Sequence, residues 1–148
     1  MDSNFEHRIP NVLGIGASDP TASTGVLADL KTFGARGVYG MGVITALTAQ
    51  NTQCTGGTDP IPPEFIAAQL AALAMDVRLD AVKIGMLPSA HAIHALLEAL
   101  PPEPPVVLDP QMIASSGAHQ MPDDALQALI HDLMPRTAIL VVNTDEAA

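Results

Sequence analysis

The architecture of this chain is indicated by three consecutive segments: Ala28-Asp29-Leu30-Lys31-Thr32-Phe33, Gly37-Val38-Tyr39-Gly40 and Val43-Ile44-Thr45-Ala46-Leu47-Thr48-Ala49-Gln50-Asn51-Thr52. The first segment has apolar residues at helical spacing, the glycines of the second end a helix, and the third is an apolar strand that finishes in polar residues. In open α/β proteins, ligands bind at the edge formed by the carboxyl ends of the strands. We therefore expect a ligand site where this strand ends.

Short apolar runs and longer helical patterns alternate along the rest of the chain. We expect strands over residues 11–16, 38–47, 81–84, 106–109 and 139–142, helices over 24–35, 64–77, 89–100 and 123–133, and a loop over 53–63. The strands are continuously apolar, which is typical of a parallel sheet covered on both faces. The sequence thus predicts an α/β fold with a doubly wound, mostly parallel sheet and helices on both faces. Residues 10–148 would form one domain after a flexible N-terminal tail, residues 1–9.

The composition excludes several classes of function. The 148 residues carry a net charge of −10 with six lysines and arginines, so the chain lacks the basic face that nucleic-acid binding requires. No apolar run is long enough to span a membrane, and no signal-peptide core follows the polar N-terminus. The single cysteine, Cys54, rules out an intrachain disulfide. We expect a cytoplasmic protein that binds neither nucleic acid nor a membrane.

Six polar or sulfur-containing side chains are candidates for a binding site. Asp29 lies on the first expected helix, Gln50, Met86 and Asp109 lie at or just after expected strands, and Asn143 and Glu146 lie where a further helix is expected to start. Each has an ordinary structural explanation, such as a solvated helix face for an aspartate, core packing for a methionine or a helix cap for an asparagine. Each also suits a ligand, because an amide donates and accepts at once and a carboxylate at a strand end can face phosphates and Mg²⁺. A new helix is expected to start near Asn143, which would place Asn143 and Glu146 on one face.

Other candidate groups are weaker. His91 and His94 share one expected helix but have no third metal ligand, and Cys54 has no base near it in the sequence. We therefore assign no metal ligand and no catalytic residue. Arg78 and Lys83 are expected to be surface charges.

Four blocks of this sequence, in this order, resemble the hydroxymethylpyrimidine and phosphomethylpyrimidine kinases of thiamine biosynthesis, which are ribokinase-like: Ala28–Phe33, Thr45–Thr52, Lys83–Leu87 and Val106–Pro110. The resemblance extends from about Val12 to Ala148 and covers the N-terminal part of that fold. It implies phosphorylation of hydroxymethylpyrimidine or its monophosphate, with ATP and Mg²⁺ as cofactors. By resemblance, a pyrimidine would be held by Asp29, Gln50 and Met86, while Mg²⁺ and phosphates would lie near Asp109, Asn143 and Glu146.

The chain departs from the family pattern at several positions around the expected ligand. The family's Gly-x-Asp-Pro-Ser-Gly-Gly-Ala-Gly motif keeps its aspartate-proline and final glycine as Asp19-Pro20 and Gly25. Bulkier residues replace its other small residues: Ala17, Ala22, Ser23 and Thr24. Further along the chain, Gln111 replaces a valine and Ser115 replaces a lysine. We expect the added bulk to narrow the substrate pocket.

Two alternatives remain beside the kinase. The sequence contains no Gly-Thr-Gly-Cys or Gly-x-Gly-Asp loop, which in ribokinase-like kinases stabilises the transferred phosphoryl group. The chain alone is therefore expected to be inactive, either as a truncated kinase that binds a pyrimidine or as one that needs a partner, whether a homodimer or a complementing chain. A flavodoxin-like signalling or structural domain is the remaining possibility, but it would not explain four blocks in the family's order.

Overall fold

The computed structural model of the chain describes residues 8–112 and 121–147, so most of the expected N-terminal tail lies outside it. The strands are β1 (Asn11–Ser18), β2 (Tyr39–Gln50), β3 (Thr55–Pro60), β4 (Ala81–Ile84), β5 (Val106–Leu108) and β6 (Ile139–Leu140). The helices are α1 (Gly25–Ala35), α2 (Pro63–Ala74), α3 (Ala90–Ala99) and α4 (Asp123–Ala128). After α4, the chain continues into a π-helical turn (Leu129–Leu133) and a 3₁₀ turn (Met134–Arg136).

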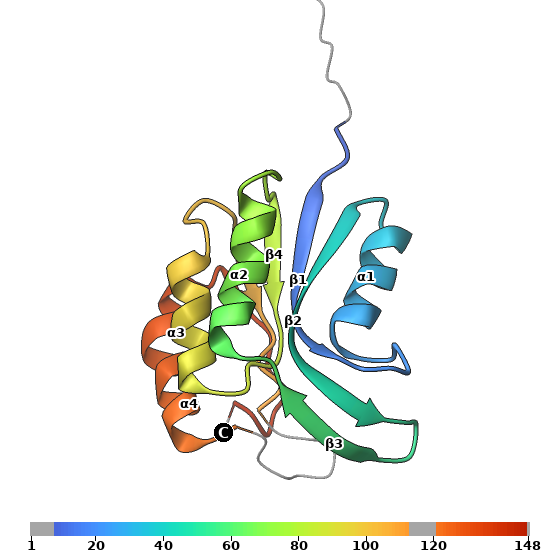
Figure 1. Cartoon of the computed structure of the whole chain (residues 1–148), viewed down its shortest axis with the longest axis vertical. Helices are drawn as coiled ribbons and strands as arrows, with labels where there is room; N and C mark the ends of the chain where they lie inside the picture. Colours follow the sequence, from blue (N-terminus) through green and yellow to red (C-terminus); the bar gives the residue numbers. More distant parts are fainter. Residues whose placement is uncertain (1–7, 113–120, 148) are drawn as a thin grey trace, which may run out of the picture.

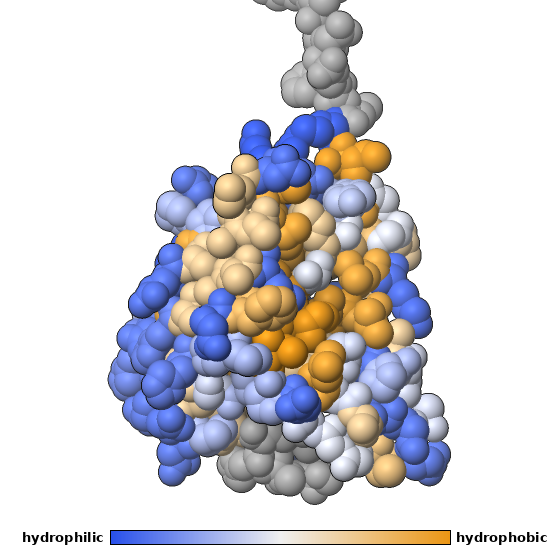
Figure 2. All heavy atoms as spheres, viewed as in Figure 1, coloured by the Kyte–Doolittle hydropathy of each residue, from blue (hydrophilic) through white to orange (hydrophobic). Residues whose placement is uncertain are grey.

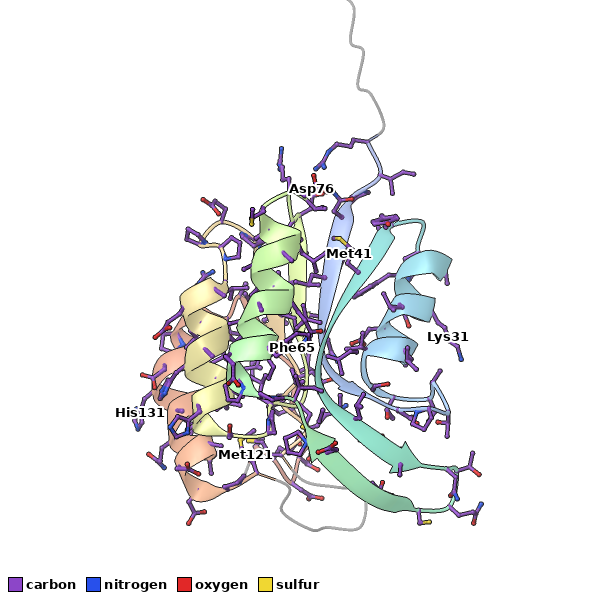
Figure 3. The ribbon with its side chains drawn as sticks, in the orientation of Figure 1. Lys31, Met41, Phe65, Asp76, Met121 and His131 are labelled. Carbon is purple, nitrogen blue, oxygen red and sulfur yellow. The ribbon has the colours of Figure 1, made fainter. Side chains whose placement is uncertain are left out.

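The strands form one sheet in the order β3-β2-β1-β4-β5-β6. All neighbouring strands are parallel except β2 and β3, which are antiparallel. Helix α1 covers one face of the sheet, while α2, α3 and α4 cover the other (Figure 1). Lys31 on α1 and His131 after α4 point away from the sheet (Figure 3). The predicted doubly wound, mostly parallel fold with helices on both faces is therefore confirmed. Within the described ranges, no helix is both long and apolar enough to cross a bilayer.

The main core lies between the sheet and α2, α3 and α4. Every second residue of the central strands faces this layer, as at Leu13 and Ile15 of β1, Val82 and Ile84 of β4, and Val106 and Leu108 of β5. These side chains pack with Ile66, Leu70, Ile93 and Leu96 of the helices, and all of them are almost completely buried. Burial of one such side chain contributes about 1.5–3 kcal/mol, so this layer is the main source of stability.

On the other face, side chains of α1 pack directly against two glycines of β2. A Cβ atom on Gly42 would lie 2.7 Å from Cγ1 of Val26, and one on Gly40 would lie 3.0 Å from the Phe33 side chain. A side chain at either position would push the helix outward. The two glycines therefore fix how close α1 comes to β1 and β2.

The prediction of a loop over residues 53–63 is wrong, because Thr55–Pro60 forms the antiparallel strand β3. All six of its residues are exposed, so the strand has none of the apolar alternation by which a half-buried strand is recognised. It is held instead by backbone pairing with Ala46–Gln50 and by a turn in which Oδ1 of Asn51 accepts hydrogen bonds from the N–H groups of Gln53 and Cys54. Thr55–Pro60 thus turns the end of β2 into a hairpin.

Strand β3 leaves the first part of β2 unpaired on its outer side, and a side chain from α2 satisfies part of this edge. The Gln69 amide donates from Nε2 to the Ile44 carbonyl and accepts at Oε1 from the Ile44 N–H, both at 3.0 Å. Apolar surface surrounds this edge between α2 and α1, with Tyr39 and Phe65 exposed (Figure 2). At the opposite edge of the sheet, β6 and the residue after it also expose apolar side chains: Ile139, Leu140 and Val141.

Gln69→Ala is expected to lower the free energy of unfolding by about 1–2 kcal/mol, because it leaves two partly buried backbone groups of Ile44 without their partner. Urea unfolding followed by circular dichroism measures this change. The control is Gln127→Ala, which makes the same substitution at an exposed position of α4. An equal effect of the two substitutions would show that the Ile44 contacts contribute nothing.

Candidate functional site

A cavity of ≈ 330 Å³ lies at the carboxyl edge of the sheet, between the strand ends and the β2–β3 hairpin. The ends of β1 and β2, the hairpin and the loops after β4 and β5 all contribute to its lining. The lining residues used below are Ala17, Asp19, Thr24, Gln50, Met86 and Gln111. This is the edge at which the sequence predicted a ligand site.

Two of the three residues predicted to hold a pyrimidine, Gln50 and Met86, line this cavity together. Gln50 is the last residue of β2 and pairs with Thr55 in the hairpin. Met86 is positioned by the turn that ends β4. There, the Gly85 N–H donates to the Ile15 carbonyl at 2.7 Å, and the buried Thr45 hydroxyl donates to the Met86 carbonyl at 2.7 Å. Both bonds tie the turn to neighbouring strands.

The third residue, Asp29, is not among the residues that line the cavity. Its side chain is 18% exposed, and its Oδ2 atom lies 3.2 Å from Nζ of Lys83. The same ammonium lies 3.5 Å from Oδ2 of Asp109, which follows β5. The structure thus joins Asp29 and Asp109 through Lys83 rather than placing Asp29 beside Gln50.

Lys83 is the residue that the sequence analysis missed. It was expected to be a surface charge, but its side chain is only 17% exposed and it pairs with two carboxylates. A signal was present in the sequence, because Lys83 interrupts the apolar strand Ala81–Ile84. A charged residue within a central strand is rarely buried unless it is paired.

Asn143 and Glu146 lie after β6 and contact each other in a reciprocal cap. Oδ1 of Asn143 accepts hydrogen bonds from the N–H groups of Asp145 and Glu146, and Oε2 of Glu146 accepts one from the Asn143 N–H at 3.1 Å. The helix expected here is a turn within residues 143–147. Neither residue lines the cavity that holds Gln50 and Met86. In this structure Asn143 therefore caps the turn, which is a common role for an asparagine at such a position.

Asp19, in the loop after β1, organises the wall of the cavity. Its carboxylate is 2% exposed and accepts hydrogen bonds of 2.8–3.0 Å from two backbone N–H groups and three hydroxyls, which belong to Thr21, Ser23 and Thr24. Burial by itself would raise the pKa of Asp19, but these hydrogen bonds outweigh burial and hold the pKa well below its usual range. Asp19 is therefore ionised at neutral pH, and its hydrogen bonds hold the loop in place.

The departures from the family pattern fall in two groups. Ala17, Thr24 and Gln111 are among the residues that line the cavity, and the Thr24 hydroxyl donates to Asp19. Ala22 and Ser23 are not among the lining residues, and the Ser23 hydroxyl donates to Asp19. Two of the positions carry a positive φ, 54° at Ala22 and 53° at Gln111. Ser115 lies outside the described residues.

Among the described residues outside the site, the ionisable side chains form only small groups, such as Asp80 with Arg8 and Arg78. In the part of the chain that the structure describes, no group of three or more histidine, cysteine, aspartate or glutamate side chains could hold a metal ion. His94 pairs with Asp132 at 3.0 Å, and Cys54 is exposed at the hairpin turn.

Asp19→Asn is expected to lower the stability of the protein at neutral pH, because an amide replaces a carboxylate that accepts five hydrogen bonds. Since folding lowers the pKa of Asp19, its stabilising effect is present above the unfolded pKa of about 4 and is lost as the pH falls through the folded value. Thermal unfolding of both proteins between pH 7 and pH 2 measures this, and the difference in Tm should shrink toward acid. The difference between the two proteins is the relevant quantity, because the pKa of Asp80 is also lowered, chiefly by the Asn11 N–H. A difference that stays constant with pH would contradict this role.

Ala22→Gly is expected to raise the free energy of unfolding by about 0.5–1 kcal/mol. The positive φ strains an alanine by roughly 1–2 kcal/mol, and the greater freedom of glycine in the unfolded chain offsets part of the gain. Urea unfolding measures the change. The matched control is Ala71→Gly on the exposed side of α2, which should be destabilising by about 1 kcal/mol. Destabilisation at both positions would show that Ala22 is unstrained.

Comparisons with known proteins support the fold and the family. Hydroxymethylpyrimidine/phosphomethylpyrimidine kinase of Escherichia coli strain K12 is 43% identical over 140 residues, which are 93% of this chain and 53% of that protein. A crystal structure of phosphomethylpyrimidine kinase from Clostridium difficile 630 superposes with a TM-score of 0.82 at 40% identity, over 90% of this chain and 58% of that one. The structure of an ADP complex of Bacillus subtilis pyridoxal kinase superposes with a TM-score of 0.81 at 31% identity. The match covers 95% of this chain and 54% of that one.

The chain spans about half the length of the curated kinases that it matches. The model of the family described as phosphomethylpyrimidine kinase matches residues 19–148, which include the Asp19 loop, the Asn143 turn and every lining residue of the cavity except Ala17. This match covers most of the chain and all six candidate residues. The chain therefore belongs to the phosphomethylpyrimidine kinase family.

Proposed function

We propose that this chain supplies the pyrimidine-binding half of a kinase that phosphorylates hydroxymethylpyrimidine or its monophosphate. The observation that carries the proposal is the cavity in which Gln50 and Met86 come together, in a chain of this family. Its volume of ≈ 330 Å³ is at the small end of the range for ligand pockets, as suits a single substituted ring.

The chemistry of the two side chains matches an aminopyrimidine. Such a ring presents an amino donor and a ring-nitrogen acceptor side by side, and an amide such as Gln50 can complement both. The thioether of Met86 is polarizable and makes favourable contacts with aromatic rings. We assign Gln50 to recognition of the ring edge and Met86 to contact with the ring, while Asp29 acts from outside the cavity through Lys83.

On the phosphate side, we propose that Asp109, Asn143 and Glu146 lie toward ATP and Mg²⁺. ATP would supply the phosphoryl group, and the substrate hydroxyl would receive it. The described residues do not by themselves form a magnesium site, since Asp109 faces Lys83 and the other two cap each other. We therefore assign no step of the transfer to a metal held by these side chains.

Titration calorimetry with hydroxymethylpyrimidine tests the proposal. We expect one binding site per chain. Gln50→Ala should lower the affinity by about fivefold or more, because the ring edge would lose paired hydrogen bonds worth about 1–3 kcal/mol. Gln127→Ala, an exposed change on α4, should bind as the unmodified chain does. Absence of binding by a folded chain, or equal binding by Gln50→Ala, would contradict the proposed site.

A further inference from the structure

Lys83 is the cation that connects the separate segments of the site. Its ammonium lies 3.2 Å from the carboxylate of Asp29 on α1 and 3.5 Å from that of Asp109 after β5. All three side chains are at least two-thirds buried. Lys83 therefore bridges the helix on one face of the sheet and the loop at its carboxyl edge.

The sheet places Lys83 where this bridge can form. In register, Lys83 of β4 pairs with Gly14 of β1 and Val107 of β5. Gly14 has no side chain, and a Cβ atom there would lie 3.4 Å from both Cβ and Oδ2 of Asp29. The helix can thus bring Asp29 down over β1 toward the neighbouring lysine.

The ammonium also lies beneath the turn that positions Met86. A Cβ atom on Gly85 would lie 3.2 Å from Nζ of Lys83, so the lysine head occupies the space beside this glycine. Gly85 precedes Met86, whose side chain lines the cavity. The Lys83 ammonium consequently lies next to the residue that precedes Met86 in the chain.

The negative charges of Asp29 and Asp109 can lie near each other because the positive charge of Lys83 lies between them. Two carboxylates share one ammonium, and the buried Oδ2 of Asp29 accepts no hydrogen bond from any residue in the described ranges. Without the lysine, two like charges would remain in a partly buried space with little compensation. Asp29 and Asp109 would then have to move or take up solvent.

We propose that Lys83 is a positioning residue, which holds α1, the Asp109 loop and the Gly85–Met86 turn in the arrangement that binds the pyrimidine. The inference rests on the proposed function for its ligand. Lys83 acts through the groups it contacts and does not itself line the cavity.

The first experiment needs no ligand. Asp29→Asn should lower Tm in the unmodified chain, because it weakens a favourable ion pair. In a Lys83→Met background, the same change should raise Tm, because it removes an uncompensated charge. Amide resonances of Met86 and Asp109 should shift in Lys83→Met and stay near their original positions in Lys83→Arg. Additive effects on Tm together with unshifted Met86 and Asp109 amides would overturn the proposal.

The second experiment measures affinity for hydroxymethylpyrimidine by calorimetry, at a temperature where every variant is folded. The affinity of Lys83→Met should be at least tenfold lower than that of the unmodified chain. The affinity of Lys83→Arg should stay within about threefold of it. Gln69→Ala, a destabilised variant away from the cavity, should bind normally, which separates positioning from stability. Unchanged affinity in Lys83→Met would overturn the inference while leaving the proposed function intact.

Two further outcomes are distinguishable. If the unmodified chain does not bind the pyrimidine, the proposed function fails, and the Tm cycle and amide shifts still decide the role of Lys83. If Lys83→Met does not fold, Gly85→Ala replaces it, because the added methyl group would press on the ammonium. Gly85→Ala should then move the Met86 amide and weaken binding, and the absence of both effects would overturn the inference.

Discussion

The parallel alignment of β1, β2, β4 and β5 is the constraint on which the site depends. Because these strands run in one direction, their carboxyl ends meet at one edge, and residues far apart in the sequence line a single cavity. The parallel strands thus bring Gln50 and Met86 to the same edge of the sheet. The antiparallel hairpin β2–β3 then extends beyond the edge and closes one side of the space.

The position of α1 against the sheet is the second constraint on the site. Glycines at positions 40 and 42 let the helix approach β2, and Gly14 makes room for Asp29 above β1. This close approach would bury an aspartate at a cost, and Lys83 offsets that cost with an ion pair. The same lysine reaches Asp109, so the packing of one helix and the geometry of the edge are linked by one charged group.

The sequence predicted the order of most helices and strands, because the helices have apolar residues at helical spacing and the central strands are short apolar runs. It missed β3, whose exposed residues carry no such pattern and whose pairing depends on the turn at Asn51. Near Asn143, where a helix was expected to start, the chain makes a capped turn in which the Ala147 N–H donates to the Asn143 carbonyl. Around the candidate site, Gln50 and Met86 both line the cavity at the predicted edge of the sheet, and their role in binding a pyrimidine stays a prediction. Lys83 was missed because its partners, on α1 and after β5, are distant in the sequence, and the ionised Asp19 could not be anticipated without its folded loop.

The central claim is that the cavity beside Met86 receives a pyrimidine ring. The most direct measurement is a nuclear Overhauser experiment on the chain with labelled methionine methyl groups and bound hydroxymethylpyrimidine, with assignment by Met86→Leu. The account predicts contacts between the Met86 methyl group and the ring protons or ring methyl of the ligand. Contacts instead with Met121 or Met134, which line a separate apolar groove beside α4 and β6, would contradict it.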